Sequence, residues 1–504
     1  MSKINNNLTW ENVMWTDVHK RLHRKQRRIF KASKDGNKYL VCRLQLQLIN
    51  SLDAKLAAVQ RVTVLNERKN TKRIDSRVYP TNQQKIKLAY SLNLDGKAMP
   101  IKRVSILKPG KEERRPLRIP TIKDKAKQYL AKFALEPEWE ARFESNSYGF
   151  RPGRSAHDAV QAIFIMLVKR ERHVLCGDIS ECFNQINHTA LLSKLDTFPK
   201  MEVQIRAWLK AEVMTSYAHR EKDNEFSTID TSQGKIISLL LANIVLHGLE
   251  NHIKQWYIHE CRYDLKNQKG YLRYNQEIAI IRYADDFVII HDKKDVIDLV
   301  RVEVSKWLSI MGLELSNDKT QIRRANQGFV FLGHKCITIN GQGGHRVKVH
   351  ISKSSKIKLI NRLGIELNRH KASSAYVLVQ SLSRIIVEWG NYFRYSECTD
   401  DFKQMNARVH NLIRAWVFRR TAQNKGRLFL REKYFPTGQS YIYNGVTHKD
   451  NWVLTGSITV NGETRKNFLP KLTWIRSQRH IKVKGSASPF DGNHIYWSQR
   501  LVSY

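Results

Sequence analysis

Hydrophobic and polar positions follow two different periods along the chain, and the places where the period changes mark its regions. From Trp15 to about residue 65, apolar residues recur at helical spacing within a strongly basic background. Residues 102–121 predict a strand, a turn and a second strand, which together make a basic hairpin. Residues 121–143 predict a helix, and 145–160 predict a loop that leads into another helix.

The middle of the chain combines short apolar strands with helices. Residues 173–183 predict a strand that ends on Asp178, and 232–253 predict a glycine turn followed by one long apolar helix. The segments 279–290 and 328–339 predict a hairpin and a further strand pair. This succession of strand, helices, hairpin and strand indicates an α+β fold.

Beyond about residue 350 the pattern is helical. Apolar residues at steps of four, three and four form one stripe, through Leu378, Leu382, Ile385 and Trp389. A second stripe ends at Trp416, and because stripes at this spacing usually face a core, we expect Trp389 and Trp416 to be buried in a helix bundle. Residues 431–504 are rich in glycine, aromatic and basic residues with short strand-like runs, and they predict a separate small module.

The charge of the chain points to a polyanionic partner. Its 504 residues include 87 Lys and Arg against 46 Asp and Glu, a formal net charge of +41. Such a charge repels itself unless a polyanion neutralises it, which indicates nucleic acid. An anionic membrane surface is the alternative, but a membrane anchor would gather its basic residues in one amphipathic segment. Here they run along the whole chain, and no apolar run reaches about 18 residues, so we expect no membrane partner.

The cysteines and the amino terminus bear on location. The six cysteines lie far apart without any CxxC pair, which argues against zinc fingers and a disulfide framework and fits a reducing compartment. The first residues, "MSKINNNLTWENVMW", have the pattern of neither a signal peptide nor a transit peptide. We therefore expect the protein to stay where it is made, or to be encoded inside the compartment that it serves.

Two adjacent carboxylates, Asp285 and Asp286, lie at the tip of the predicted apolar hairpin 279–290. Burying unpaired charge is costly, so a cation is expected there, and Mg²⁺ takes one or two carboxylates while accepting phosphate oxygens at its other positions. Because side chains alternate along a strand, the two point the same way only if the turn rotates one of them. Asp178 is the natural third ligand. Two such metals about 4 Å apart activate a 3′-hydroxyl and stabilise a leaving pyrophosphate.

A series of segments, taken in order over roughly residues 45–504, resembles those of group II intron-encoded reverse transcriptases and maturases. The segments are "AKLAAVQRVT" (54–63), "RVSILKPGKEERRPLRIPTIKDK" (103–125), "NSYGFRPGRSAHDAV" (146–160), "CGDISECFNQINH" (176–188), "SQGKIISLLLANIVLHGLE" (232–250), "RYADDFVI" (282–289), "LELSNDKTQI" (313–322), "FVFLGH" (329–334), "LSRIIVEWGNYFRY" (382–395) and "SPFDGNHIYWSQR" (488–500). Together they make a specific match.

The resemblance implies an α+β right-hand polymerase. Its fingers and an N-terminal extension would occupy residues 1–165, and its palm, with a ferredoxin-like antiparallel sheet and the catalytic YADD hairpin, residues 166–345. A helical thumb, the maturase domain X, would occupy residues 346–430. The remaining residues, 431–504, would form a small C-terminal nucleic-acid-binding module.

The resemblance also implies roles for individual residues. Asp178, Asp285 and Asp286 match the catalytic carboxylates that hold two Mg²⁺ ions, with Asp178 and Asp285 as the expected direct ligands. Positions that match nucleotide-binding residues are Lys108, Arg115, Phe183, Gln233 and Gly234. Lys319 and Gly333 match positions near the primer and template. The implied partners are intron RNA, an RNA template with a DNA primer, and deoxynucleoside triphosphates; no particular oligomeric state is implied.

Some positions depart from the family pattern. The segment TPQGG of the family reads "TSQGK" here, with Ser232 and Lys235, and its RPLGIP reads "RPLRIP", with Arg118 in place of glycine. Loss of glycine from a strained turn generally disturbs the geometry there. The chain also shows no paired cysteines of an HNH endonuclease, so we expect no DNA cleavage.

Two functions follow as hypotheses. The first is a maturase that binds intron RNA, promotes its splicing and retains an RNA-directed DNA polymerase site; the second is a splicing-only maturase with an inactive polymerase fold. The Lys- and Asn-rich composition, the drifted motifs and the amino terminus favour an organelle, a plastid before a mitochondrion, with bacterial cytoplasm as the alternative.

Overall fold

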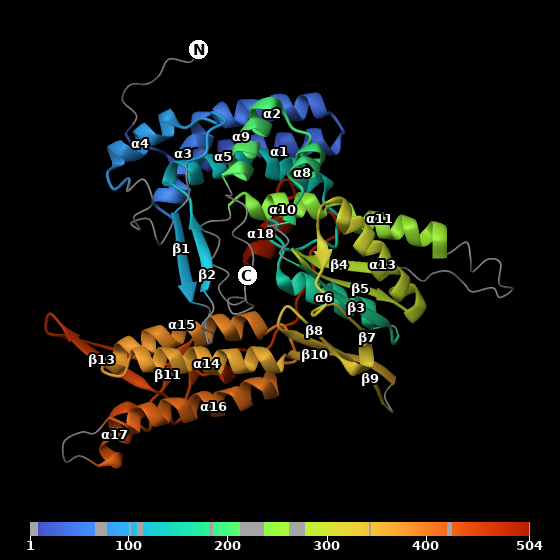
Figure 1. Cartoon of the computed structure of the whole chain (residues 1–504). Helices are drawn as coiled ribbons and strands as arrows, with labels where there is room; N and C mark the ends of the chain where they lie inside the picture. Colours follow the sequence, from blue (N-terminus) through green and yellow to red (C-terminus); the bar gives the residue numbers. More distant parts are fainter. Residues whose placement is uncertain are drawn as a thin grey trace.

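The computed structural model shows helices, a central antiparallel sheet and a second group of helices, in agreement with the predicted α+β class (Figure 1). It describes residues 9–65, 78–99, 102–107, 114–168, 170–180, 185–211, 236–261, 278–341, 344–420 and 426–502. Of residues 102–107 and 114–119 it describes the backbone alone. None of the helices in these ranges is both long enough and apolar enough to span a membrane.

The N-terminal region is a helical layer followed by a hairpin. Its helices are α1 (Trp15–Lys34), α2 (Lys38–Asn50), α3 (Leu52–Thr63), α4 (Asn82–Ser91) and α5 (Ile122–Arg142), and its strands are β1 (Lys102–Leu107) and β2 (Arg114–Ile119). The predicted helical stretch is divided where Asn37 and Ser51 cap α2 and α3 with side-chain oxygens. Strands β1 and β2 pair antiparallel, with Arg115 opposite Ile106, as the sequence predicted for this hairpin.

The central sheet is antiparallel and has the strand order β4-β5-β3-β6, with β7 also paired to β3. Its strands are β3 (His173–Ser180), β4 (Ala279–Tyr283), β5 (Asp286–His291), β6 (Glu314–Leu315) and β7 (Gln321–Arg324). One face, with Leu175 and Phe287, packs into the core of the N-terminal helices. The other face, with Val174 and Val288, packs into the second core. Both faces are buried, which explains the continuous apolar runs in the sequence.

Helices surround this sheet. They are α6 (Ala156–Leu167), α8 (His188–Leu195), α9 (Pro199–Lys210), α10 (Ser238–Leu246), α11 (Leu249–Trp256) with the π-turn η3 (Tyr257–Cys261), and α13 (Lys294–Ile310). The prediction of one long helix over 232–253 is wrong, because the chain breaks between α10 and α11. His247 is extended there, and Gly248 has φ +95°, a conformation that suits glycine and interrupts a helix.

A second, three-stranded sheet and a helical group follow. The sheet has the order β10-β9-β8, with β8 (Phe329–Phe331), β9 (His334–Gly341) and β10 (Gly344–Ile351), and η4 (Ala325–Gln327) precedes it. The helices are α14 (Lys353–Arg369), α15 (Ala375–Phe393), α16 (Thr399–Phe418) and α17 (Arg427–Tyr434). Trp389 and Trp416 are buried in this group, which confirms the prediction from their spacing. Strand β10 was not predicted.

The C-terminal part contains two small hairpins and then returns to the start of the chain. Its elements are β11 (Tyr441–Tyr443), β12 (Val446–His448), β13 (Thr455–Val460), β14 (Glu463–Phe468), η5 (Leu472–Trp474) and α18 (His494–Val502). Asp158 of α6 is fully buried and accepts hydrogen bonds from His480 (3.0 Å), Arg500 (2.7 Å) and the main-chain nitrogen of Val483 (2.7 Å). Phe490 packs on Phe30 of α1. Residues 480–502 therefore tie the end of the chain to α6 and to α1.

Candidate active site

The paired carboxylates lie where strands β3, β4 and β5 meet. Strands β4 and β5 form a hairpin in which Tyr283 pairs with Asp286, so Ala284 and Asp285 make a two-residue turn. Ala284 has φ +57°, as tight hairpin turns require. On the other side of β5, Asp286 lies directly opposite Asp178 of β3. Directly opposed residues of antiparallel strands share a face, so these two carboxylates project together.

The position of Asp178 differs slightly from the prediction. Strand β3 does not end on it but continues for two residues, because Ile179 and Ser180 pair with β6. Asp286, and not Asp285, is therefore the cross-strand partner of Asp178, while Asp285 stands in the turn.

Buried polar contacts fix the turn of the YADD hairpin. The guanidinium of Arg282 is buried and donates hydrogen bonds to Asn243 Oδ1 (3.1 Å) and to the carbonyl of Ala284 (3.2 Å). The amide of Asn243 in turn donates to the carbonyl of Gly149 (2.7 Å). A Cβ on residue 149 would collide with the backbone of Ala284, so only glycine lets the 146–153 loop lie this close to the turn. The sequence alone suggested none of these three supporting residues.

Lys319 forms an ion pair with one of the candidate carboxylates, Asp178. It stands in the connection from β6 to β7, and its Nζ donates a hydrogen bond of 3.1 Å to Asp178 Oδ2. The Asp178 side chain is 14% exposed and the Lys319 side chain 58% exposed, so the pair lies at the edge of solvent. The sequence assigned Lys319 to the primer strand, and the structure brings it to the carboxylates themselves.

A cavity of about 460 Å³ opens beside this pair. We call it the carboxylate cavity; the charged side chains that line it are Asp178, Asp286, Asp318, Lys319, Arg323 and Lys335. Carboxylates beside lysine and arginine suit a ligand that carries both a metal ion and phosphate groups. The cavity thus presents charges of both signs, three carboxylates and three cations.

The donor set fits Mg²⁺ in part. Asp178 and Asp286 supply the one or two carboxylates that Mg²⁺ takes from proteins, with waters and phosphate oxygens completing its shell. Within the described ranges, no three His, Cys, Asp or Glu side chains are grouped closely enough to hold a metal ion. Asp178 and Asp286 are thus paired across two strands, and Asp285 stands in the adjoining turn.

Gly333 lies in the second hairpin, at the edge of the carboxylate cavity. Leu332 and Gly333 form the two-residue turn between β8 and β9, and both have positive φ, +48° and +78°. Two side chains hold this turn: His334 Nδ1 and the Tyr392 hydroxyl each donate to the Leu332 carbonyl, both at 3.0 Å. Leu332 itself lines the carboxylate cavity. Two hydrogen bonds thus hold the turn, and its residue Leu332 lines the carboxylate cavity.

The remaining predicted nucleotide-binding residues are not placed. Lys108, Phe183, Gln233 and Gly234 lie outside the described residues, and of Arg115 only the backbone is described. Their roles stay predictions.

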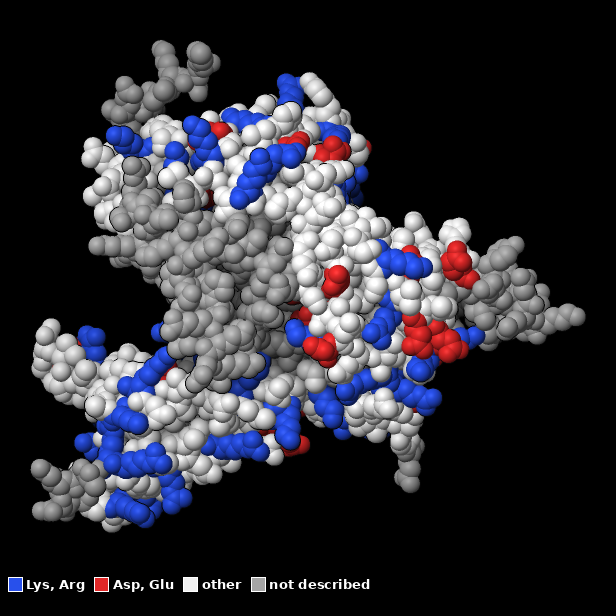
Figure 2. All heavy atoms as spheres, in the orientation of Figure 1, with Lys and Arg blue, Asp and Glu red and all other residues white. Residues whose placement is uncertain are grey.

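A long groove lies between helices α14 and α15. Its volume is about 1170 Å³, and the basic residues that line it are Lys358, Arg362, Arg369 and Arg384. Figure 2 shows Lys and Arg spread over the α14–α17 region, with few Asp or Glu on the same face. A basic groove of this kind suits a nucleic-acid backbone.

Comparison with known proteins places the chain. Residues 106–336 match the model of "Reverse transcriptase (RNA-dependent DNA polymerase)", residues 10–92 match "N-terminal domain of reverse transcriptase" and residues 360–435 match "Group II intron, maturase-specific domain". The three matches follow one another without overlap. The first of them contains the β4–β5 hairpin and the turn between β8 and β9, and it ends inside β9.

Curated relatives agree with these matches. Protein YkfC of Escherichia coli is 32% identical over 260 residues, which are 47% of this chain and 67% of that protein. The group II intron-encoded protein LtrA of Lactococcus lactis is 29% identical over 331 residues, but the match spans only 52% of its length. Maturase-like protein 1 of Euglena gracilis is 24% identical over 408 residues, 77% of this chain and 78% of that protein. The chain therefore belongs to the family of group II intron-encoded reverse transcriptases and maturases.

Proposed function

We propose that this protein binds intron RNA and promotes its splicing, and that it retains an RNA-directed DNA polymerase site. The observation that carries the proposal is the pairing of Asp178 with Asp286 at a cavity that also holds lysine and arginine, in a chain with a maturase-specific domain. The basic groove of α14 and α15 supports RNA binding, since phosphate contacts dominate such affinity.

We assign the parts of a right-hand polymerase to the fold as follows. The N-terminal helices with the β1–β2 hairpin are the fingers, the central sheet with its helices is the palm, α14–α17 are the thumb, and residues after 431 are the C-terminal module. Residues 165 and 345 lie inside α6 and β10, so each boundary belongs at a neighbouring loop. Two buried cores meet at the sheet; the N-terminal helices share one with the palm, and α14–α17 and the C-terminal residues share the other with it.

The chemistry is nucleotidyl transfer. When bound, Mg²⁺ would lower the pKa of the primer hydroxyl and stabilise the pyrophosphate that leaves. Asp178 and Asp286 would hold the ions, and Asp285, in the turn beside them, completes the triad. Lys319, Arg323 and Lys335 would attract the triphosphate, and the turn at Leu332 and Gly333 would orient the primer end.

A second candidate is a splicing-only maturase. One contact favours it: the Lys319 ammonium pairs with Asp178, one of the carboxylates that would hold a metal ion. Arg118 and Lys235, which replace glycines of the family pattern, also favour the splicing-only maturase. In that case the polymerase fold would serve as a scaffold for RNA.

The deciding experiment is DNA synthesis by the full chain on a poly(rA) template primed with oligo(dT), in Mg²⁺. An Asp285→Ala, Asp286→Ala double variant with intact RNA binding serves as the control. Synthesis by the unchanged protein alone supports the retained polymerase. Tight RNA binding by both proteins with synthesis by neither establishes the splicing-only alternative, provided that addition of the protein accelerates splicing of the precursor RNA.

We further propose an organelle, a plastid first, as the location. Support comes from the Lys- and Asn-rich composition and from the Euglena relatives, which match over more of both chains than LtrA does. Fractionation of the source cells with an antibody against the protein tests this directly.

A further inference from the structure

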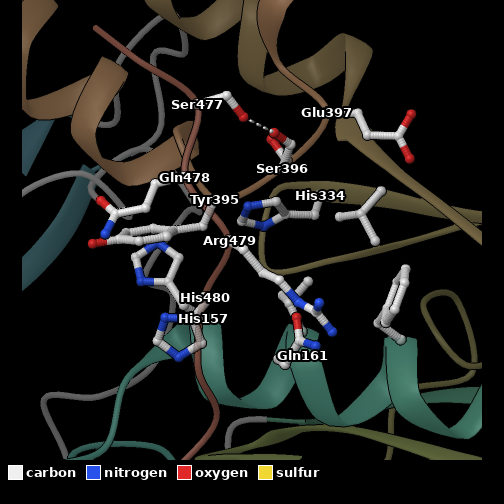
Figure 3. Close-up of a pocket in the computed structure, with 13 residues that line it drawn as sticks. His157, Gln161, His334, Tyr395, Ser396, Glu397, Ser477, Gln478, Arg479 and His480 are labelled. Carbon is white, nitrogen blue, oxygen red and sulfur yellow. Dashed lines mark hydrogen bonds between the residues drawn. The ribbon is translucent and has the colours of Figure 1, made fainter. Parts of the chain in front are cut away.

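A second cavity lies apart from the carboxylate cavity and shares none of its lining residues. It has a volume of about 320 Å³ and is enclosed by α6, the β8–β9 hairpin, the end of α15 and the segment after η5 (Figure 3). We call it the histidine pocket, because His157, His334 and His480 line it together with Tyr395. Small-ligand pockets begin at about 300 Å³, so its volume suits one small planar group.

Aromatic rings form one wall of the histidine pocket. The ring of His157 lies 4.6 Å from that of Tyr395 and 5.5 Å from that of His480, and the latter two are 5.2 Å apart. Figure 3 shows these three rings grouped along one side, with Arg479 and Gln161 toward the other. Rings at these distances offer faces and edges on which another flat ring can pack.

Hydrogen bonds fix the tautomers of two histidines. His157 Nε2 lies 2.7 Å from the carbonyl of Tyr392, and His334 Nδ1 lies 3.0 Å from the carbonyl of Leu332. Because a carbonyl only accepts, each of these nitrogens carries the proton, and the other nitrogen of each ring is an acceptor. Nδ1 of His157 is buried and has no hydrogen-bond partner in the described part of the chain. This atom has almost no accessible surface, so its neighbours cover it and the rings, not this nitrogen, are what the pocket offers to a ligand.

Charge narrows the class of ligand. Burial lowers the pKa of His157 to about 4 and that of His334 to about 3, so both rings are neutral at physiological pH. Neutral imidazoles do not attract a free phosphate. The described residues also contain no group of three His, Cys, Asp or Glu side chains that could hold a metal ion, so an uncharged planar ligand suits the pocket best.

The rim adds a place for a phosphate outside the pocket. Arg479 is exposed and belongs to the basic segment 476–484, which has no acidic residue. Glu397 is also at the rim, but Figure 3 shows its carboxylate pointing away from the rings. A nucleotide within a strand has these two parts: a planar, uncharged base for the pocket and an anionic phosphate for the rim.

We propose that the histidine pocket takes one unstacked nucleobase of a bound RNA, packed against the rings of His157, Tyr395 and His480, with the adjoining phosphate beside Arg479. Proteins read single-stranded RNA in this manner, by stacking splayed bases on aromatic rings and bonding to their edges. The inference rests on the proposed function, since it requires that the chain bind RNA.

Crosslinking tests the proposal with the full chain and a random single-stranded RNA 12-mer as the probe. The complex is irradiated at 254 nm, and the crosslinked residues are identified by mass spectrometry. We expect adducts on Tyr395 or on the histidines around it. His157→Phe keeps a ring and should keep most of these adducts, whereas His157→Leu removes the ring and should reduce them about fivefold to tenfold. Arg479→Gln, on an exposed residue that leaves the fold intact, should reduce them as well.

Arg476→Gln is the matched control, because Arg476 is exposed on the same segment but does not line the pocket. An equal loss of pocket adducts in Arg476→Gln and Arg479→Gln would overturn the proposal, since it would reflect the general charge of the segment. RNA binding in a filter assay without any pocket adduct would also overturn it and leave the proposed function standing. Absence of RNA binding altogether would overturn both this proposal and the proposed function.

Discussion

The Lys319 ammonium lies 3.1 Å from the carboxylate of Asp178, the residue of β3 that stands directly opposite Asp286 of β5. It neutralises part of the negative charge that a metal ion would otherwise meet. An ion pair this exposed contributes only about 0 to 1 kcal/mol.

Removing that cation should strengthen metal binding. We expect Lys319→Ala to lower the Mn²⁺ concentration for half-saturation by about twofold to fivefold, because the carboxylate pair then lacks its internal cation. Electron paramagnetic resonance of free Mn²⁺ measures this without any catalysis. Lys335→Ala is the control, since Lys335 lines the same cavity. Equal shifts in the two variants would show that the cavity responds to total charge and not to the Asp178 contact.

Substitution of Gly149 should disturb the YADD turn. Gly149→Ala would push its Cβ into the backbone of Ala284, and we expect a loss of about 1–3 kcal/mol in the free energy of unfolding together with loss of DNA synthesis. Gly364→Ala is the matched control, because Gly364 is inside helix α14 with open space around it and should gain about 0.5–1 kcal/mol. Urea unfolding of the two variants decides the matter; similar stability of both would contradict the close approach.

The Tyr392 hydroxyl should stabilise the Leu332–Gly333 turn. Tyr392→Phe removes one of the two donors to the Leu332 carbonyl. We expect the free energy of unfolding to fall by about 1 kcal/mol, and the primer concentration for half-maximal DNA synthesis to rise. Tyr39→Phe, at a tyrosine that is 79% exposed, should change neither quantity. A stable variant with an unchanged primer requirement would show that the His334 bond holds the turn by itself.

The buried histidines should make the protein sensitive to mild acid. His157 and His334 have folded pKa values of about 4 and 3, against 6.5 when unfolded, so below pH 6.5 the unfolded chain binds more protons. Stability is therefore complete above pH 6.5 and is lost as the pH falls toward 4, by about 1.4 kcal/mol per pH unit for each ring. Urea unfolding between pH 7 and pH 5 measures the slope. His157→Phe should reduce it, whereas His188→Gln, at an exposed histidine, should leave it unchanged.

The hairpin 279–290 could be predicted because two strand-forming apolar runs flank a short turn that carries Asp285 and Asp286. The pairing of Asp178 with Asp286 could not, because register depends on how β3 is set between β5 and β6, which are distant in sequence. Strand β10 was missed although its residues alternate between exposed and buried positions as those of a strand do, and the break at Gly248 was hidden by apolar residues on both sides. The supporting contacts of Arg282, Asn243 and Gly149 are tertiary, and single-sequence patterns do not carry them.

The attachment of the C-terminal segment to Asp158 sets an order of events during synthesis. His480 and Arg500 follow Asp158 by 322 and 342 residues, so the ribosome makes the carboxylate long before its partners. Until they arrive, α6 cannot bury Asp158 without leaving a charge unpaired, which costs several kcal/mol. A nascent or prematurely terminated chain therefore keeps this helix end loosely packed and open to proteases. Completion of the core is coupled in this way to translation of residues 480–500.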